Sequence, residues 1–108
     1  MKSLNRIELI GHVGVDPEIR TTKRGTRVAS LTLATNRKSG GEEVTDWHRL
    51  IFWDQLAGLA EKYVRKGDPL WIEGQVQYST SGQDGEKRFW TEIVVSEVVF
   101  LGSPRTGA

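Results

Sequence analysis

The stretch TDWHRLIFWDQL, residues 45–56, is the part of this chain whose residue types could bind a flat ligand. Side chains alternate between the two faces of a strand, so Trp47, Arg49 and Trp53 share one face. Indole rings stack on any nucleobase, and a guanidinium between two rings can reach a phosphate or stack on a base. This face therefore predicts a stacking platform. The alternative is that both tryptophans cap a barrel or pack in a subunit interface.

The other aromatic residues have less distinctive neighbours. In residues 45–56 the opposite face holds Leu50 and Phe52, with His48 near its end, and resembles a core face. Tyr78 stands where a later strand enters its loop, which suits either a further stacking group or a rim position. We expect Phe89 on a core face and Trp90 on the opposite one. A polar face suits solvent, ligand or a partner subunit, and its residues are Trp71, Glu73, Gln75 and Gln77.

Positive charge is concentrated in one segment, although the formal net charge is only +1. Between positions 20 and 38 there is no acidic residue, and the basic residues are Arg20, Lys23, Arg24, Arg27, Arg37 and Lys38. Such a segment attracts phosphate even in a neutral protein. A solvated basic loop is the alternative explanation.

Little in the sequence points to catalysis or to a metal. The 108 residues include no cysteine, and His12 and His48 have no carboxylate at metal-ligand spacing. The glycines of GHVG lack the pattern of a dinucleotide-binding loop. We therefore expect no catalytic residue, no metal and no cofactor. No apolar run approaches the ~20 residues of a membrane helix, so we expect no membrane partner and a cytoplasmic location.

The hydrophobic pattern predicts five strands and one helix. We expect strands over residues 4–13, 28–38, 44–53, 69–78 and 88–102, with turns or loops at GVDPE, TTKRGTR, SGGEE and STSGQDGEK. The helix is predicted by the spacing of Leu56, Leu59, Ala60 and Tyr63. Asp54 is placed as its N-cap and Gly67 at its left-handed C′ position.

The order of these elements predicts the fold. Three strands, a helix and two further strands are typical of the all-β, five-stranded Greek-key barrel called the oligonucleotide/oligosaccharide-binding fold. Another small barrel, such as an SH3-like one, is the alternative, and a full helix at this position counts against it. We expect residues 1–102 to form one domain and residues 103–108 a disordered tail.

Four blocks of sequence resemble the bacterial-type single-stranded DNA-binding proteins, which also occur in mitochondria. They are LNRIELIGHVGVDPEIR, VASLTLAT, TDWHRLIFWDQLAGLAEKYVRKGD and LWIEGQV, and the similarity runs from Leu4 to Leu101. The resemblance implies a barrel that wraps single strands without catalysis, as a homotetramer built from two dimers. We assign Trp71, Glu73 and Gln75 to the sheet face between subunits.

The resemblance also implies roles for individual residues. Trp47 and Trp53 match stacking positions, and Arg49 matches a phosphate-contacting arginine. Basic positions that face DNA in the family correspond to Arg6, Arg20 and Lys66. His48 matches a histidine associated with subunit association.

The chain departs from the family pattern in three places. A tryptophan common after the second strand is absent from TNRKSGGEE, and an aromatic residue near the last hairpin is missing or replaced by Tyr78. The chain stops at SPRTGA, without the acidic tip that recruits replication and repair proteins. We expect such partners only if the full-length protein carries that tip. Alternatives are a primosome or phage accessory protein, an RNA-binding relative, a nuclease, or a polymerase accessory domain.

Overall fold

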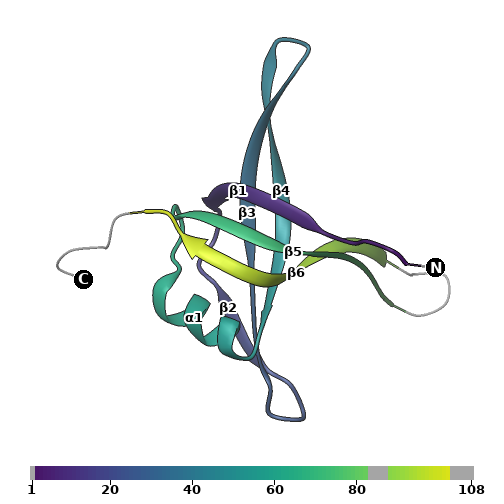
Figure 1. Ribbon diagram of the computed structural model, residues 1–108, viewed down its shortest axis with the longest axis vertical. Coiled ribbons are helices and arrows are strands. Elements are labelled where there is room, and N and C mark those ends of the chain that lie inside the picture. The colour runs from purple at the N-terminus through teal and green to yellow at the C-terminus, as the bar shows by residue number, and fades with distance from the viewer. Residues whose placement is uncertain (1, 83–87, 103–108) are drawn as a thin grey trace.

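The protein folds into one β-barrel from which strand hairpins project, as the computed structural model shows for residues 2–82 and 88–102 (Figure 1). The elements of this part of the chain are β1 (Ile7–Val13), β2 (Glu18–Thr21), β3 (Arg27–Ser39), β4 (Glu42–Trp53), α1 (Gln55–Tyr63), β5 (Pro69–Ser81) and β6 (Arg88–Phe100). The predicted tail, residues 103–108, lies outside the described residues, as do residues 83–87 of the predicted last loop.

The barrel closes because β1 pairs with two different strands. The hydrogen-bonded order is β1–β5–β6–β4–β3, and β1 returns to β3 through His12 opposite Ala34 and Val13 opposite Leu33. All of these pairings are antiparallel except that of β4 with β6, which is parallel. Closure removes the free strand edges that would otherwise pair with other chains. The predicted five-stranded Greek-key barrel is confirmed, and the SH3-like alternative is wrong.

The core lies inside the barrel and beneath the helix. Alternation along β3 and β4 turns Leu31, Leu33, Leu50 and Phe52 inward, and all four are buried. Burying one such side chain contributes about 1.5–3 kcal/mol. The helix α1 packs against β2, β3 and β4, and its buried side chains include Ala57 and Ala60.

The sequence pattern did not predict one of the strands. The short β2 was expected to be part of the irregular stretch between residues 13 and 28, but it pairs with β3 from Glu18 opposite Ser30 to Thr21 opposite Arg27. The break at Gly14–Pro17 separates it from β1, and both strands use the same side of β3. Because β2 has only four residues, its alternation is too brief to stand out in the sequence.

The prediction of a flexible loop at SGGEE is wrong. Ser39 pairs with Glu42, so only Gly40 and Gly41 connect β3 to β4. Both glycines have positive φ, 61° and 87°, which suits the two-residue hairpin turns that match strand twist. The strands therefore continue past the barrel as a long β3–β4 arm, at the top of Figure 1.

The predicted N-cap residue of the helix is confirmed, whereas the predicted C-terminal end is wrong. Asp54 is the N-cap of α1, and its carbonyl accepts a hydrogen bond of 3.1 Å from the Gly58 amide, but its side chain makes no capping hydrogen bond. Asp54 has a φ of 54°, and its amide donates to the Arg27 carbonyl at 2.9 Å. The helix ends at Tyr63 with Val64 as C-cap, so Gly67 is not at C′. Gly67 lies in the turn before β5 and donates to the Val13 carbonyl at 2.7 Å.

The prediction that Phe89 belongs to a core face is wrong, although Ile93 and Val95, which share its parity along β6, are buried. Phe89 pairs with Thr80 in the β5–β6 arm and is 74% exposed. Further along β6 the register shifts by one residue at Ser96, so Glu73 pairs with Glu97. This bulge exchanges the two faces of β6 beyond Val95.

Candidate nucleic-acid interface

The outer face of β4 presents the aromatic residues that the sequence singled out. Trp47 is 61% exposed and Trp53 is 44% exposed, while Leu50 and Phe52 of the same strand are buried. Arg49 lies between the two rings and is also exposed. Ile51 shares their face but is buried where β6 pairs with β4. The predicted division of β4 into a core face and an exposed face is confirmed.

Trp47 rests on a glycine that leaves room for its ring. A Cβ atom built on Gly14 would lie 2.5 Å from Trp47 Cζ3 and 2.6 Å from Thr32 Oγ1. The amide of Gly14 donates to the Thr32 carbonyl at 2.9 Å, which fixes this glycine beside β3. Trp47 is therefore supported from the side of Gly14 and remains largely open to solvent. Sequence reasoning missed this role, because Gly14 and Trp47 are close only once β1 pairs with β3.

Trp53 ends β4 at the opposite end of the platform. It pairs with Val28 of β3, and Val28 pairs in turn with Arg20 of β2. Paired residues project from the same side of a sheet, so Arg20 and Trp53 flank the buried Val28. One predicted phosphate contact is thus placed on the same face as one predicted stacking ring.

Arg49 contacts two residues of the neighbouring strand β6. Its Nε lies 3.4 Å from Glu92 Oε2, and its Cζ lies 5.7 Å from the centroid of the Trp90 ring. Glu92 also accepts a hydrogen bond of 2.9 Å from Ser79 Oγ on β5. Trp90 was not among the predicted site residues. Its alternation with Glu92 was visible in the sequence, but the parallel pairing of β4 with β6 was not.

The basic stretch does not form one patch. Arg20, Arg24 and Arg27 are exposed around the β2–β3 hairpin, whereas Arg37 and Lys38 lie on the β3–β4 arm. In Figure 1 these two hairpins project in opposite directions. Arg27 and Lys38 stand near opposite ends of the 13-residue β3, roughly 35 Å apart at about 3.3 Å per residue.

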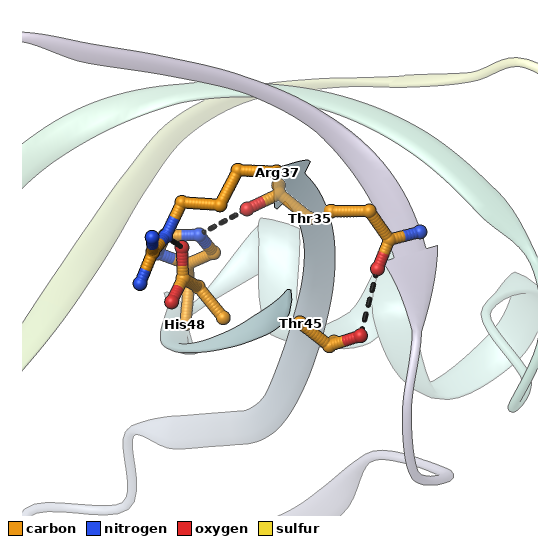
Figure 2. A network of polar contacts seen from close by, with 6 residues as sticks. Thr35, Arg37, Thr45 and His48 are labelled. Atoms are coloured by element: carbon orange, nitrogen blue, oxygen red, sulfur yellow. Dashed lines mark hydrogen bonds and ion pairs between the residues drawn. The ribbon is translucent and has the colours of Figure 1, made fainter. Parts of the chain in front are cut away.

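Three further predicted arginines are engaged by carboxylates. Arg37 Nε lies 2.7 Å from Asp46 Oδ2 (Figure 2), and Arg27 Nη1 lies 3.2 Å from Glu61 Oε1. Arg6 Nη2 lies 2.8 Å from Glu73 Oε1 of β5, and the strand order places β6 between β5 and β4. Arg6 is therefore on the predicted subunit face and not beside Trp47.

Lys38 and Lys66 carry exposed side chains in two separate places. Alternation along β3 puts Lys38 on the same side of the arm as Trp47 and puts Arg37 on the other side. Lys66 lies in the turn between α1 and β5, where its amide donates to Asp16 Oδ1 at 2.8 Å. Of these two cations, Lys38 is the one that shares the face of the platform.

His48 lies on the inward-facing side of β4 and is only partly buried. Its Nε2 shares a hydrogen bond of 2.8 Å with Thr35 Oγ1 of β3. Asn36 Oδ1 accepts a hydrogen bond of 2.8 Å from Thr45 Oγ1. Figure 2 shows both contacts beside the ion pair of Arg37, so polar side chains tie the two strands together where the arm leaves the barrel.

Tyr78 is the most exposed predicted stacking residue, at 82%, but it is not on the face of Trp47. It pairs with Thr91, and the next residue, Ser79, contacts Glu92 on the opposite face of β5. Tyr78 instead shares a side of the β5–β6 arm with Phe89, which pairs with Thr80 two positions along. The structure thus places an exposed pair of aromatic side chains on this arm.

The predicted subunit face is part apolar and part acidic. Trp71 is half-buried and pairs with Ile10 of β1 and Val99 of β6, both of which are exposed. The adjacent row consists of Glu8, Glu73 and Glu97. Beyond the bulge, Gln75 pairs with Val94 and is exposed.

Over residues 2–82 and 88–102, no three His, Asp or Glu side chains gather closely enough to hold a metal ion. In the same part of the chain, α1 is too short to cross a membrane.

A closed barrel with this strand order and a helix between β4 and β5 is an oligonucleotide/oligosaccharide-binding fold. The chain belongs to the single-strand binding protein family, whose profile matches residues 4–101. A single-stranded DNA-binding protein 1 of Chlorobaculum tepidum is 39% identical over 98% of this chain and 70% of its own length. A single-stranded DNA-binding protein of Xylella fastidiosa is 37% identical over 98% of this chain and 68% of its own.

A solved structure has the same fold. The single-stranded DNA-binding protein of Plasmodium falciparum, in complex with single-stranded DNA, superposes with a TM-score of 0.86 at 35% identity. The match covers 94% of this chain and 98% of that one. The resemblance predicted from the four sequence blocks is confirmed.

Proposed function

We propose that this chain binds single-stranded DNA without sequence preference and without catalysis. The observation that carries the proposal is the exposed row of Trp47, Arg49 and Trp53 along the outer face of β4. Support also comes from the relatives, whose names state that they bind single-stranded DNA. In this role the protein covers single strands exposed in replication, recombination and repair.

Stacking accounts for binding that tolerates any sequence. Every base has a flat π-face, so Trp47 and Trp53 accept each base, at about 1–3 kcal/mol per stacked base. Arg49 between the rings, Arg20 beside Trp53 and Lys38 on the arm then neutralise phosphates. Each neutralised phosphate releases counterions, which makes binding dependent on salt and not on sequence.

We further propose a homotetramer built from two dimers. The motive is the outer face of β1, β5 and β6, where Ile10 and Val99 remain exposed beside Trp71 in the single chain. Packing two such faces together removes apolar surface from water. Glu73, Gln75 and His48 are assigned to the contacts between subunits. A cytoplasmic site beside the nucleoid is consistent with the bacterial relatives.

Competition between nucleic acids tests the proposed function. Fluorescence anisotropy with labelled dT oligomers should give tighter binding than a duplex of equal length, at the same salt concentration. Mixed-sequence oligomers should bind as oligo-dT does, within a few-fold. Tighter binding to duplex would contradict the proposal, and equal or tighter binding of oligo-U would assign the site to RNA. Release of nucleotides from the oligomer would assign it to a nuclease.

A further inference from the structure

Trp90 and Arg49 form a pair on the outer faces of β6 and β4 that the proposed platform does not explain. The Arg49 guanidinium carbon lies 5.7 Å from the centroid of the Trp90 ring, within the range of a cation–π contact. Trp90 is only partly buried. The position that the guanidinium occupies over the ring is also the position in which a stacked base would lie.

We propose that Trp90 is a third base-stacking position, which Arg49 covers in the DNA-free protein and uncovers when its guanidinium moves to a phosphate. This inference rests on the proposed binding of single-stranded DNA and adds a residue and a coupled movement to it. A base can replace the Arg49 guanidinium on the Trp90 ring, because a guanidinium and a base both stack on an indole face.

Glu92 holds the Arg49 guanidinium over the Trp90 ring through a long ion pair. The Glu92 side chain is 16% exposed, and its Oε2 lies 3.4 Å from Arg49 Nε, compared with 2.7 Å in the pair of Arg37 with Asp46. The other Glu92 oxygen accepts the Ser79 hydroxyl at 2.9 Å. When Arg49 leaves, Glu92 therefore keeps a hydrogen-bond donor. A phosphate and Glu92 compete for the same guanidinium.

The Trp90 indole N–H supplies a second reason for the exchange. Its Nε1 is buried and has no hydrogen-bond partner among the described residues. A buried donor without a partner is unfavourable, since it lost its bonds to water on folding. If movement of Arg49 uncovers this donor, a base oxygen or a phosphate oxygen can accept a hydrogen bond from it.

The direct test follows each tryptophan separately. Protein labelled with 5-fluorotryptophan gives one fluorine resonance per tryptophan, and single Trp→Phe variants assign the four. On titration with dT oligomers the Trp47 and Trp90 resonances should both shift at the same concentration. If Trp47 responds and Trp90 does not, this inference is overturned and the proposed function stands. If neither the fluorine resonances nor the anisotropy of the labelled oligomer shows binding, the proposed function itself fails.

A double-mutant cycle separates stacking on Trp90 from simple positioning of Arg49. Trp90→Leu should weaken oligo-dT binding roughly fivefold or more, whereas Trp90→Phe keeps a flat ring and should lose less. In an Arg49→Ala background, Trp90→Leu should still weaken binding by a similar factor. If the effect of Trp90→Leu vanishes in that background, Trp90 only positions Arg49 and the stacking role is wrong. Thermal melting checks that each variant is folded.

Removing the ion pair between Arg49 and Glu92 should strengthen the binding of single-stranded DNA. Glu92→Gln removes the competitor for Arg49 and should tighten oligo-dT binding about two- to fivefold, the range expected for a partly exposed ion pair. Glu42→Gln on the β3–β4 arm is the matched control, because it changes net charge equally, lies outside the proposed subunit face, and Glu42 has no ion pair within the described residues. Equal effects of the two substitutions would show that charge alone matters and would overturn the competition.

Discussion

At the scale of single residues, substitutions of the exposed tryptophans of β4 should weaken DNA binding without lowering the stability of the fold. If Trp47 and Trp53 stack on bases, Trp47→Ala and Trp53→Ala should each remove about 1–3 kcal/mol of binding free energy per stacked base. Their melting temperatures should change little, because Trp47 is 61% exposed and Trp53 is 44% exposed, and neither belongs to the core. The slope of log affinity against log salt should not change, since stacking neutralises no phosphate.

Tyr63→Ala is the control for that pair of substitutions. Tyr63 is an exposed aromatic residue of α1 that contacts Phe100, so its loss should lower stability slightly and leave affinity alone. A steep fall in the melting temperature of both tryptophan variants, without loss of oligo-dT binding, would mean that the rings serve packing.

Gly14 offers a second test at this scale. In Gly14→Ala the new methyl group meets the Trp47 ring and the Thr32 hydroxyl, so the ring must move. We expect weaker oligo-dT binding in the Gly14→Ala variant and almost no further loss when Trp47→Ala is added. Gly58→Ala in α1 is the matched control, because a Cβ there has ordinary space, and it should stabilise the helix by about 0.5–1 kcal/mol. Additive losses in the double variant would refute the link.

At the scale of elements, the Gly40–Gly41 turn sets the length of the β3–β4 arm. Gly40 has a φ of 61°, which asparagine adopts readily and valine does not. Gly40→Asn should leave amide hydrogen exchange in the arm unchanged or slower. Gly40→Val should speed exchange at Lys38 and Glu43 while the barrel amides keep their protection. Equal exchange in both variants would show that the turn does not depend on left-handed residues.

The elements also show what the sequence could predict and what it could not. Alternation within one strand was sufficient for Trp47, Arg49 and Trp53, because a strand fixes its own two faces. The contact of Arg49 with Trp90 was hidden, since it depends on β4 pairing with a strand some forty residues further along the chain. The basic stretch misled for a related reason. Arg27 and Lys38 belong to one short basic segment of the sequence, but the extended strand β3 places them near its opposite ends.

At the scale of the whole molecule, positive charge at both ends of β3 should appear in the salt dependence. Each phosphate contact contributes about 0.7 to the slope of log affinity against log salt. On a long oligo-dT, Arg20→Ala and Lys38→Ala should each reduce the slope by about 0.7, and together by about 1.4. Lys2→Ala serves as a control, because Lys2 precedes β1. A double variant with an unchanged slope would remove these residues from the DNA path.

The assembly can be disrupted at its proposed face. Ile10→Asp places a charge beside Trp71 and next to the row of Glu8, Glu73 and Glu97, so the tetramer should dissociate. Light scattering should report a smaller mass while the far-ultraviolet spectrum stays that of a folded barrel. Ser30→Asp, on a partly buried β3 position outside that face, is the control. A wild-type mass near the 12.1 kDa of one chain would contradict the assembly directly.

The parallel pairing of β4 with β6 has a consequence for the order of folding. The β3–β4 hairpin joins neighbouring segments across two glycines, and hairpins of this kind form in about 1–10 μs. Leu50 and Ile93 are separated in the sequence by α1 and β5. Contacts between residues so far apart in the chain are slow to form. We therefore expect Trp47 and Trp53 to be aligned early, on the β3–β4 hairpin, and Arg49 to reach Trp90 only when the native state is complete. A partly folded molecule could offer two rings to a strand but not the third.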